Sequence, residues 1–365
     1  MDRAGEPVED AADDDVDLYE VATWEERTSV DGLAVALHWI GVTGARWLTI
    51  VVAALILLTF VTQTALGVVL GDPFLSTMVV LSIVPALALA AYVWHADVTT
   101  GEPLTLLVAT FLLSVLFANF AAVLNSFGSA AIFAVLGETP IGMAVFFFLI
   151  VGPVEETVKW LAIRLYAFRS DRFNAVIDGA VYGAAAGLGF ATIENAIYIG
   201  RSLEDADLVE TPGDSTLALF TVEPGIGVGL GLAIAGVVGL ETIGVAGPMA
   251  AIRALAGPGH VLYSAIAGYY LGLAKFNPDQ AGPIVIKGLL IAAVLHAAYN
   301  TGTMIVPPLL ALSPLIPDLL AVVIYVIGFL TIVGYVLFRK LARYRRVYRE
   351  VEAGQRPEEI AARVK

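Results

Sequence analysis

Long apolar segments recur along most of this 365-residue chain, and they limit its possible folds more than any other feature. A helix needs about 20 apolar residues to cross the hydrocarbon core of a bilayer. The mean hydropathy of +0.83 is also too high for a soluble globular protein. The sequence therefore predicts an all-α polytopic membrane protein. We expect about eight spanning helices, near residues 47–70, 76–94, 103–124, 140–167, 174–200, 253–275, 283–304 and 318–338.

A glycine-rich segment, residues 222–247, is also long enough to cross a membrane. Its sequence, VEPGIGVGLGLAIAGVVGLETIGVAG, contains eight glycines, which make it a poor candidate for a rigid helix. A further crossing here would also reverse the orientation of every span that precedes it. We therefore expect a re-entrant hairpin or an interfacial element that returns to the outer side.

The N-terminal region, residues 1–46, is strongly acidic, with twelve Asp and Glu residues against three Arg. We expect a cytoplasmic tail that is solvated and largely disordered, because it has too little apolar content to fold alone. The net charge of −14 resembles the acidic composition that keeps proteins soluble in a high-salt cytoplasm. The chain has no Cys, which excludes disulfides and thiolate chemistry.

A basic segment directly follows the last predicted span. Residues 339–349, RKLARYRRVYR, contain six basic residues and no acid. By the positive-inside rule this segment is cytoplasmic. We therefore expect a transmembrane domain over 47–338, a basic cytoplasmic tail over 339–365, and location in the cell membrane with both termini inside. The same count places the loop RSDR (169–172) inside and residues 201–221 outside.

Ionisable and amide side chains interrupt four of the predicted spans. A carboxylate at membrane depth costs about 2.5 kcal/mol or more. At 1.5 Å of rise per residue, these groups fall into one layer between the bilayer centre and its outer side. Scattered structural polar residues need not coincide in depth. The groups are Glu155, Glu156 and Lys159 in GPVEETVKW, Glu194 and Asn195 in FATIEN, His260 in GPGHVLYS, and His296 and Asn300 in LHAAYN.

Each of these groups also has an ordinary structural explanation. A lone histidine in a spanning helix is often a hydrogen-bond partner between helices. Lys159 follows Glu155 by four residues and Glu156 by three, so it can pair with either. One lysine cannot neutralise two glutamates, so at least one carboxylate needs a proton, a metal or a water-filled cavity. The spacings GAAAG (183–187) and GYYLG (268–272) are typical of helix-packing faces.

Known hydrolase signatures narrow the chemistry. The chain contains no H-E-x-x-H metal motif, no G-x-S-x-G elbow, and neither Y-D nor G-x-G-D of an aspartyl protease pair. What remains is glutamate and histidine supplied by separate helices. That combination suits the activation of water, with a carboxylate as general base and imidazoles that hold a metal or orient the water.

The order of the motifs resembles a known family. E-E-x-x-K on one helix is followed by F-x-x-x-E-N (FATIEN) on the next, then by a lone His and by H-x-x-x-N (HAAYN). This pattern is similar to that of the PrsW-type intramembrane metalloproteases, distant relatives of the CAAX prenyl endopeptidases. The resemblance covers a protease-like core over 140–304. It implies a metal-dependent endopeptidase that hydrolyses peptide bonds of membrane-anchored proteins.

The resemblance also implies that the glutamate pair acts on water. Successive helical residues point about 100° apart, so one of the two should face the cavity squarely. We expect Glu155 to be the general base and Glu156 to be held by Lys159, with the reverse assignment as the alternative.

A divalent metal, Zn²⁺, is the cofactor that we expect. Two imidazoles and a carboxylate are a common catalytic zinc set, and here His260, His296 and Glu194 would supply them. Asn300 lies one turn beyond His296 and could stabilise an oxyanion through its amide. In a metal-free alternative, the histidines and Asn300 hydrogen-bond a water that Glu155 activates.

Two other functions compete with proteolysis. A proton-coupled secondary transporter also uses intramembrane carboxylates and histidines, but it should show an inverted repeat, and we find no such symmetry. A catalytically inactive membrane scaffold would leave the convergent Glu and His residues unexplained. The partners that we expect are a membrane-anchored protein substrate and membrane lipids, and we expect no nucleic acid.

Overall fold

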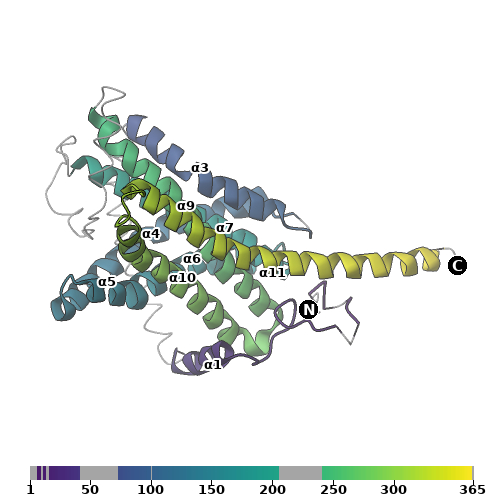
Figure 1. Cartoon of the computed structure of the whole chain (residues 1–365). Helices are drawn as coiled ribbons and strands as arrows, with labels where there is room; N and C mark the ends of the chain where they lie inside the picture. Colours follow the sequence, from purple (N-terminus) through teal and green to yellow (C-terminus); the bar gives the residue numbers. More distant parts are fainter. Residues whose placement is uncertain are drawn as a thin grey trace.

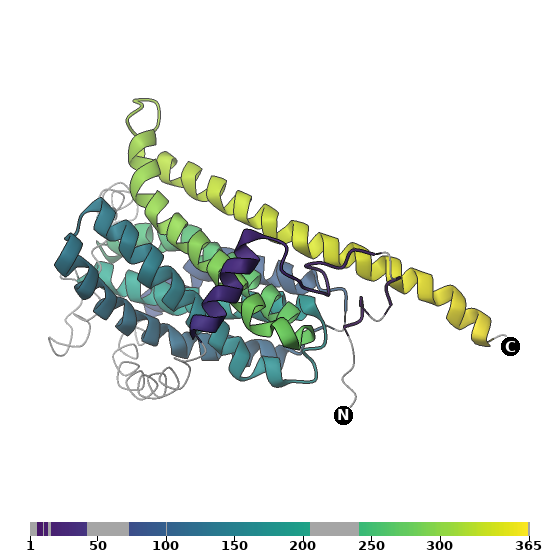
Figure 2. The same cartoon turned by 90° about the horizontal axis from the view of Figure 1, so that it is seen from below.

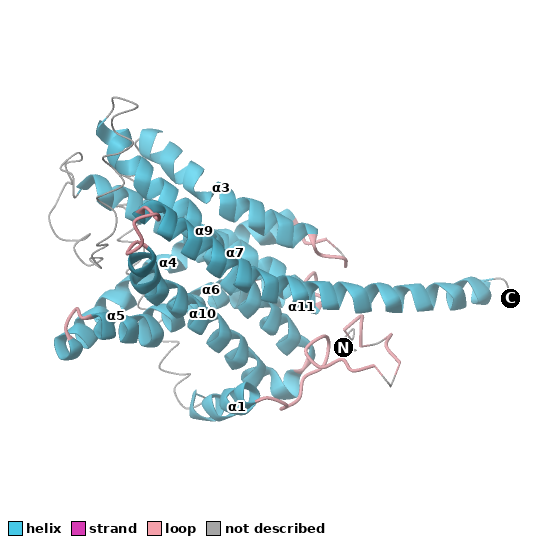
Figure 3. Ribbon diagram, viewed as in Figure 1, coloured by secondary structure: helices cyan, strands magenta, loops and turns pink. Residues whose placement is uncertain are grey.

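The computed structural model describes residues 6–9, 11–13, 16–41, 73–99, 101–204 and 241–363. Within these ranges the protein is built from helices joined by loops, without a β-strand (Figures 1 and 3). The helices are α1 (Ser29–Gly41), α3 (Pro73–His95), α4 (Leu104–Leu136), α5 (Pro140–Phe146), η1 (Phe147–Val151), α6 (Gly152–Leu165), η2 (Ala167–Arg169), α7 (Val176–Glu204), α9 (Glu241–Phe276), η4 (Pro278–Gln280), α10 (Ala281–Leu310) and α11 (Asp318–Arg363). The prediction of an all-α polytopic membrane protein is confirmed.

Six helical segments of the described chain are long and apolar enough to cross a membrane. They are Thr77–His95, Leu104–Leu136, Pro140–Arg169, Val176–Ser202, Pro278–Leu310 and Asp318–Val351. Large apolar side chains on them face outward, including Leu112, which is 57% exposed, and Ile332, which is 68% exposed. Such a surface suits lipid rather than water. The predicted span 47–70 lies outside the described residues, and the number of eight stays a prediction.

Helices α7 and α9 form the centre of the bundle and run antiparallel. Their close approach depends on glycine, because a Cβ at Gly183 would lie 2.2 Å from Ser264 O. A Cβ at Gly187 would lie 2.3 Å from His260 O, and one at Gly268 would lie 2.0 Å from Gly179 O. The two small-xxx-small segments are therefore packing faces, as predicted. This contact sets the depth of His260 against α7.

Helix α9 begins at the end of the bundle where α7 finishes. Residues 222–240 of the predicted re-entrant element lie outside the described residues. Residues 241–247 form the first turns of α9, which continues through Pro248 and Pro258 to Phe276. This helix is 36 residues long, so it starts well before the predicted span 253–275.

A short π-helical segment precedes the glutamate pair. The helix that starts at Pro140 widens into η1 over Phe147–Val151 and returns to α-helical geometry at Gly152. Gly152 packs against α10, where an added Cβ would lie 2.5 Å from Ala293 O. Single-turn π-helical segments inside α-helices occur frequently at functional sites. Here they precede Glu155 and Glu156 by a single helical turn.

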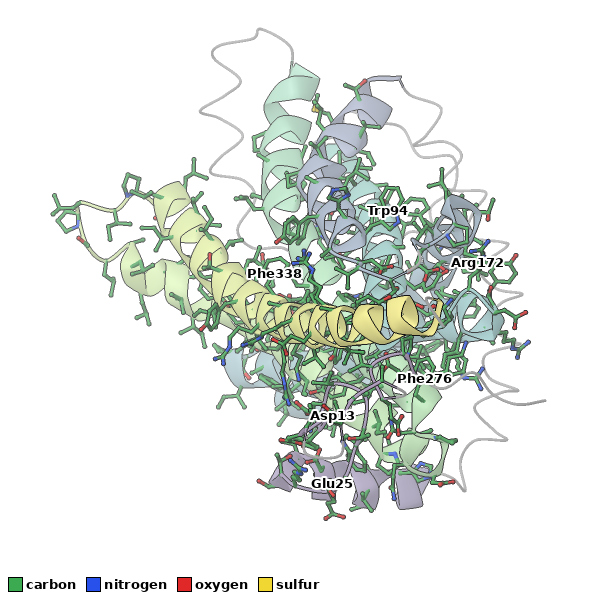
Figure 4. The ribbon with its side chains drawn as sticks, turned by 90° about the vertical axis from the view of Figure 1, so that its right-hand side faces the viewer. Asp13, Glu25, Trp94, Arg172, Phe276 and Phe338 are labelled. Carbon is green, nitrogen blue, oxygen red and sulfur yellow. The ribbon has the colours of Figure 1, made fainter. Side chains whose placement is uncertain are left out.

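The N-terminal segment and the basic part of α11 meet at one end of the bundle (Figures 1 and 2). Tyr344 donates a hydrogen bond of 2.5 Å to Glu6, and Lys340 donates one of 2.7 Å to Glu20. The backbone N–H of Trp24 donates to Asn277 Oδ1 at 3.0 Å. Figure 4 looks onto this end, where Asp13, Glu25, Trp94, Arg172 and Phe276 are labelled. The N-terminal segment, the 169–172 loop and the α9–α10 connection therefore share one side of the bundle.

Part of the acidic region is ordered against the bundle, which the expectation of a largely disordered tail did not anticipate. Helix α1 packs along α10. Glu20 and Asp31 both form ion pairs with Lys287, whose side chain is only 4% exposed. A buried ammonium group requires such partners. Glu20 and Asp31 of the acidic region therefore pair with a lysine far along the chain.

Candidate active site

Three helices, α6, α9 and α10, bring buried polar side chains together inside the bundle. Helix α6 supplies Glu155, Glu156 and Lys159, α9 supplies His260 and α10 supplies His296; α6 packs against α7, α9 and α10. All five side chains are buried. These five groups of the polar layer predicted from helical rise therefore form one connected cluster in space.

Glu156 has more hydrogen-bond partners than Glu155. Its Oε1 accepts a hydrogen bond of 2.7 Å from Lys159 Nζ and lies 2.9 Å from His296 Nδ1. Its Oε2 accepts a longer hydrogen bond of 3.4 Å from Ser264. These contacts orient the His296 ring and leave its Nε2 atom facing away from Glu156. Tyr263 stacks on the same ring, with the two centroids 5.3 Å apart.

His260 lies between a cation and an anion. Its Nδ1 is 2.9 Å from Lys159 Nζ, and its Nε2 is 2.7 Å from Glu194 Oε2. Lys159 also lies 4.2 Å from the ring centroid of Phe190, the first residue of FATIEN. The His260 and His296 rings meet edge-on, with centroids 5.1 Å apart. Both ring planes are therefore constrained by packing as well as by hydrogen bonds.

Glu155 has one oxygen held and one oxygen free. Its Oε1 accepts a hydrogen bond of 3.1 Å from Asn125 Nδ2 on α4. Its Oε2 is buried and has no hydrogen-bond partner. That oxygen lies 3.7 Å from His296 Nε2 and 3.8 Å from Lys159 Nζ, too far for hydrogen bonds. A buried carboxylate oxygen without a donor is costly unless the site takes up a water or an ion.

The residues present fit a divalent metal. Potential ligand atoms of Glu155, His260 and His296 all lie within 4.8 Å of one another, and all three residues are buried. Metal-bound histidines usually have their second nitrogen hydrogen-bonded to a carboxylate, and His296 Nδ1 has this partner in Glu156. The orphaned Glu155 Oε2 is consistent with the same conclusion. Glu194 is not a member of this close group, although it contacts His260 directly.

Arg253 is a residue of this region that the sequence reasoning missed. Its Nη2 lies 2.5 Å from Glu194 Oε2, the oxygen that also contacts His260. Its Nε donates a hydrogen bond of 2.9 Å to Asn195 Oδ1. Arg253 precedes His260 by two helical turns, so the i, i+7 spacing on α9 was the available signal. Asn195, in turn, donates a 2.9 Å bond to Ser82 on α3.

Asn300 lies on α10 one turn beyond His296, as the H-x-x-x-N spacing requires, and it is half-buried. Its backbone oxygen accepts a hydrogen bond of 2.6 Å from Thr303 Oγ1. Its side chain is therefore on the same helical face as His296 but closer to the end of the bundle where α10 finishes.

Comparisons with known proteins identify the family of this chain. The chain matches the model of the PrsW family intramembrane metalloprotease over residues 102–333. Protease PrsW of Shouchella clausii is 25% identical over 225 residues, covering 61% of this chain and 82% of that protein. Protease PrsW of Bacillus subtilis is 28% identical over 222 residues, covering 60% and 78%. No solved structure matches the chain significantly. Because the matched region spans more than half of the chain and contains the whole cluster of α6, α7, α9 and α10, the chain belongs to the PrsW family of intramembrane metalloproteases.

Proposed function

We propose that Glu155 is the general base of this intramembrane protease and that its substrates are proteins anchored in the same membrane. One observation carries the assignment of the base: Glu155 Oε2 is buried, has no donor and lies 3.7 Å from His296 Nε2. A general base needs a free lone pair within reach of the water that it deprotonates. Glu156 has no such atom, because Lys159, His296 and Ser264 occupy its oxygens.

We further propose that His260, His296 and a glutamate hold one Zn²⁺ ion. Two imidazoles and one carboxylate are a frequent catalytic zinc set. When bound, the metal would polarise the scissile carbonyl and lower the pKa of its water. The sequence-based assignment makes Glu194 the third ligand. The alternative ligand is Glu155, which is favoured by the 4.8 Å group that it forms with the two histidines.

The remaining residues position these groups. Glu156 fixes the ring of His296, and Lys159 joins Glu156 to His260. Asn300 is proposed to donate its amide to the oxyanion that develops on the substrate carbonyl. The burial of the cluster also excludes bulk water, which strengthens each electrostatic contact.

Metal analysis of the purified protein tests this proposal. We expect about one Zn²⁺ per chain in the wild type, and its loss in His260→Ala and His296→Ala. If Glu194→Gln retains the metal and Glu155→Gln loses it, Glu155 is the third metal ligand and Glu194 is the candidate general base. Glu138→Gln, an exposed residue of the α4–α5 connection, is the matched control. Full cleavage of a single-span peptide in liposomes after exhaustive chelation would contradict the metal model.

We also propose that both termini are cytoplasmic. The support is that the basic segment of α11, the N-terminal segment and the 169–172 loop share one side of the bundle. The positive-inside rule then makes that side cytoplasmic. Because the chain has no Cys, single substitutions Ser170→Cys and Ser202→Cys give clean labelling sites at opposite ends. Labelling of Ser170→Cys, but not of Ser202→Cys, by an impermeant reagent outside intact cells would contradict this orientation.

A further inference from the structure

A second group of carboxylates lies away from the active site, where the α3–α4 connection meets the start of α7. Asp97 follows α3, Glu102 precedes α4 and Asp178 lies in the first turn of α7. One oxygen from each lies within 4.8 Å of the others. Along α7, Asp178 is roughly 24 Å from Glu194 at 1.5 Å of rise per residue. The two groups are therefore separate sites.

These carboxylates are buried, and two of their oxygens have no hydrogen-bond donor. Glu102 is 3% exposed and Asp178 is fully buried, while Asp97 is half-buried. Glu102 Oε2 accepts a hydrogen bond from the Tyr182 hydroxyl, but Glu102 Oε1 is buried without a partner. Asp97 Oδ1 accepts from Thr99 at 2.7 Å, but its Oδ2 is buried without a partner. A buried carboxylate oxygen without a donor needs a proton, a water or a cation beside it.

The three carboxylates also have no directly paired positive charge among the described residues. Among the described residues, no Lys or Arg forms an ion pair with any of the three carboxylates. Arg172 and Lys275 act on the group only over a longer distance. Burial, with the nearby charge of Asp97, raises the pKa of the Glu102 carboxyl to about 7. Three acids in one buried place therefore need protons or a cation.

We propose that Asp97, Glu102 and Asp178 bind one hard divalent cation, Ca²⁺ or Mg²⁺. The donors are all oxygen, and the set lacks the imidazole or thiolate that zinc and copper prefer. Thr99 Oγ1, 3.4 Å from Asp178 Oδ1, adds a hydroxyl oxygen at the same place. The partial exposure of Asp97 leaves an open side for water ligands, which Mg²⁺ retains and Ca²⁺ tolerates.

Such an ion would join two segments that are far apart in the sequence. Asp178 Oδ2 already accepts hydrogen bonds from the backbone N–H groups of Asn174 (2.7 Å) and Ala175 (2.8 Å), which fixes the start of α7. The cation would tie the α3–α4 connection to that start. It therefore stabilises the end of the bundle and takes no part in the hydrolysis.

Cation binding to the full-length protein in detergent tests the proposal. The protein is stripped with a chelator, and binding of ⁴⁵Ca²⁺ is then measured by equilibrium dialysis, with Mg²⁺ as competitor, in high KCl that screens the acidic surface. The background is His260→Ala/His296→Ala, so the catalytic site does not contribute. We expect one equivalent of bound Ca²⁺ or Mg²⁺ per chain and a higher midpoint of thermal unfolding when it is present.

Substitutions then assign the site. Glu102→Gln and Asp97→Asn should each lose this equivalent and the thermal shift, while far-UV circular dichroism stays unchanged. Asp178→Asn is a third variant, which also tests the capping of α7. Asp171→Asn removes an exposed acid on the same side of the bundle and should bind as the parent does. Equal binding and an equal thermal shift in Glu102→Gln and in the parent would overturn the proposal and indicate that the carboxyls share protons instead.

Discussion

Helix α7 carries two acids, the fully buried Asp178 and the half-buried Glu194, and the two have opposite surroundings. Glu194 contacts Arg253 and His260, and the neighbouring Glu156 contacts Lys159. Asp178, by contrast, faces Glu102 and Asp97. Burial of a charge is tolerated when a partner of opposite sign is buried with it. Around Glu194 and Glu156 the protein itself supplies the positively charged partner. Around Asp178 we propose that a cation from solution supplies it.

This difference separates two uses of a buried carboxylate. In the active-site cluster, donors from the chain contact both oxygens of Glu156 and Oε1 of Glu155, whereas Glu155 Oε2 has no donor. In the acidic group, by contrast, oxygens without a donor occur on both Glu102 and Asp97. Single substitutions can therefore show whether the charge of each carboxylate is neutralised by a positively charged side chain of the protein.

The largest expected effect comes from Glu155→Gln. The amide preserves size and the contact with Asn125 but cannot accept a proton from water, so activity should fall by roughly 10²–10⁴-fold. The thermal unfolding midpoint should change little. Glu156→Gln should instead lower that midpoint, because removing one partner of a buried ion pair costs about 3–5 kcal/mol. The assignment of the base would be wrong if Glu156→Gln left a stable, inactive protein and Glu155→Gln kept its activity.

The N-terminal segment contains a second place where charges of opposite sign are paired, Glu20 and Asp31 with Lys287. The double substitution Glu20→Gln/Asp31→Asn leaves Lys287 buried without a counter-charge, which should cost about 3–5 kcal/mol of unfolding free energy. Thermal unfolding in detergent measures this loss. Glu25→Gln, which removes only an exposed pair with Arg27, should leave stability nearly unchanged. Unchanged stability in the double variant would contradict a stabilising role for these contacts and favour the predicted, largely disordered tail.

Arg253 gives a smaller effect, expressed in metal affinity. Without Arg253, Glu194 loses the contact that holds it against His260, so Arg253→Met should weaken metal binding by about 10–100-fold. Arg253→Lys keeps the charge and should recover part of this loss. Competition with a chromophoric chelator measures the affinity independently of activity. Equal affinity in the wild type and in Arg253→Met would show that Glu194 needs no such support.

The smallest expected effect is a pH dependence at the acidic group. The folded-state pKa of Glu102 is about 7, above its ordinary value of 4.5, so the folded state binds the proton more tightly than the unfolded state. Its contribution to stability is full below about pH 4.5 and is lost as the pH rises through 7. The titratable groups around it are Asp97, Asp178, Tyr182, Arg172 and Lys275.

Chelated protein should therefore lose stability between these two pH values, and added Ca²⁺ should remove much of that loss by taking the place of the proton. Thermal unfolding at each pH, in the parent and in Glu102→Gln, gives the comparison. If the stability of Glu102→Gln depends on pH as that of the parent does, another group causes the pH dependence.

Much of the fold could be predicted because hydropathy is a local property. Each long apolar segment must be a helix in lipid, whatever its neighbours, since its backbone groups have no other partners there. The helix termini were less predictable, as α9 shows by starting at Glu241. The contacts of Glu20 and Asp31 with Lys287 were also out of reach, because their partner lies more than 250 residues away.

The sequence by itself determined which helices carry the reactive groups, and helical rise gave the height of each group along its own helix. It also determined the family, through four motifs in order. Only the tertiary structure decided which groups touch, because that depends on how each helix is rotated and how closely glycine lets α7 approach α9. This rotation leaves Glu155, rather than Glu156, with a free oxygen, and it pairs Glu194 with Arg253. It also leaves Asp97, Glu102 and Asp178 together without a cation from the described chain, because burial is set by packing and not by the order of residues.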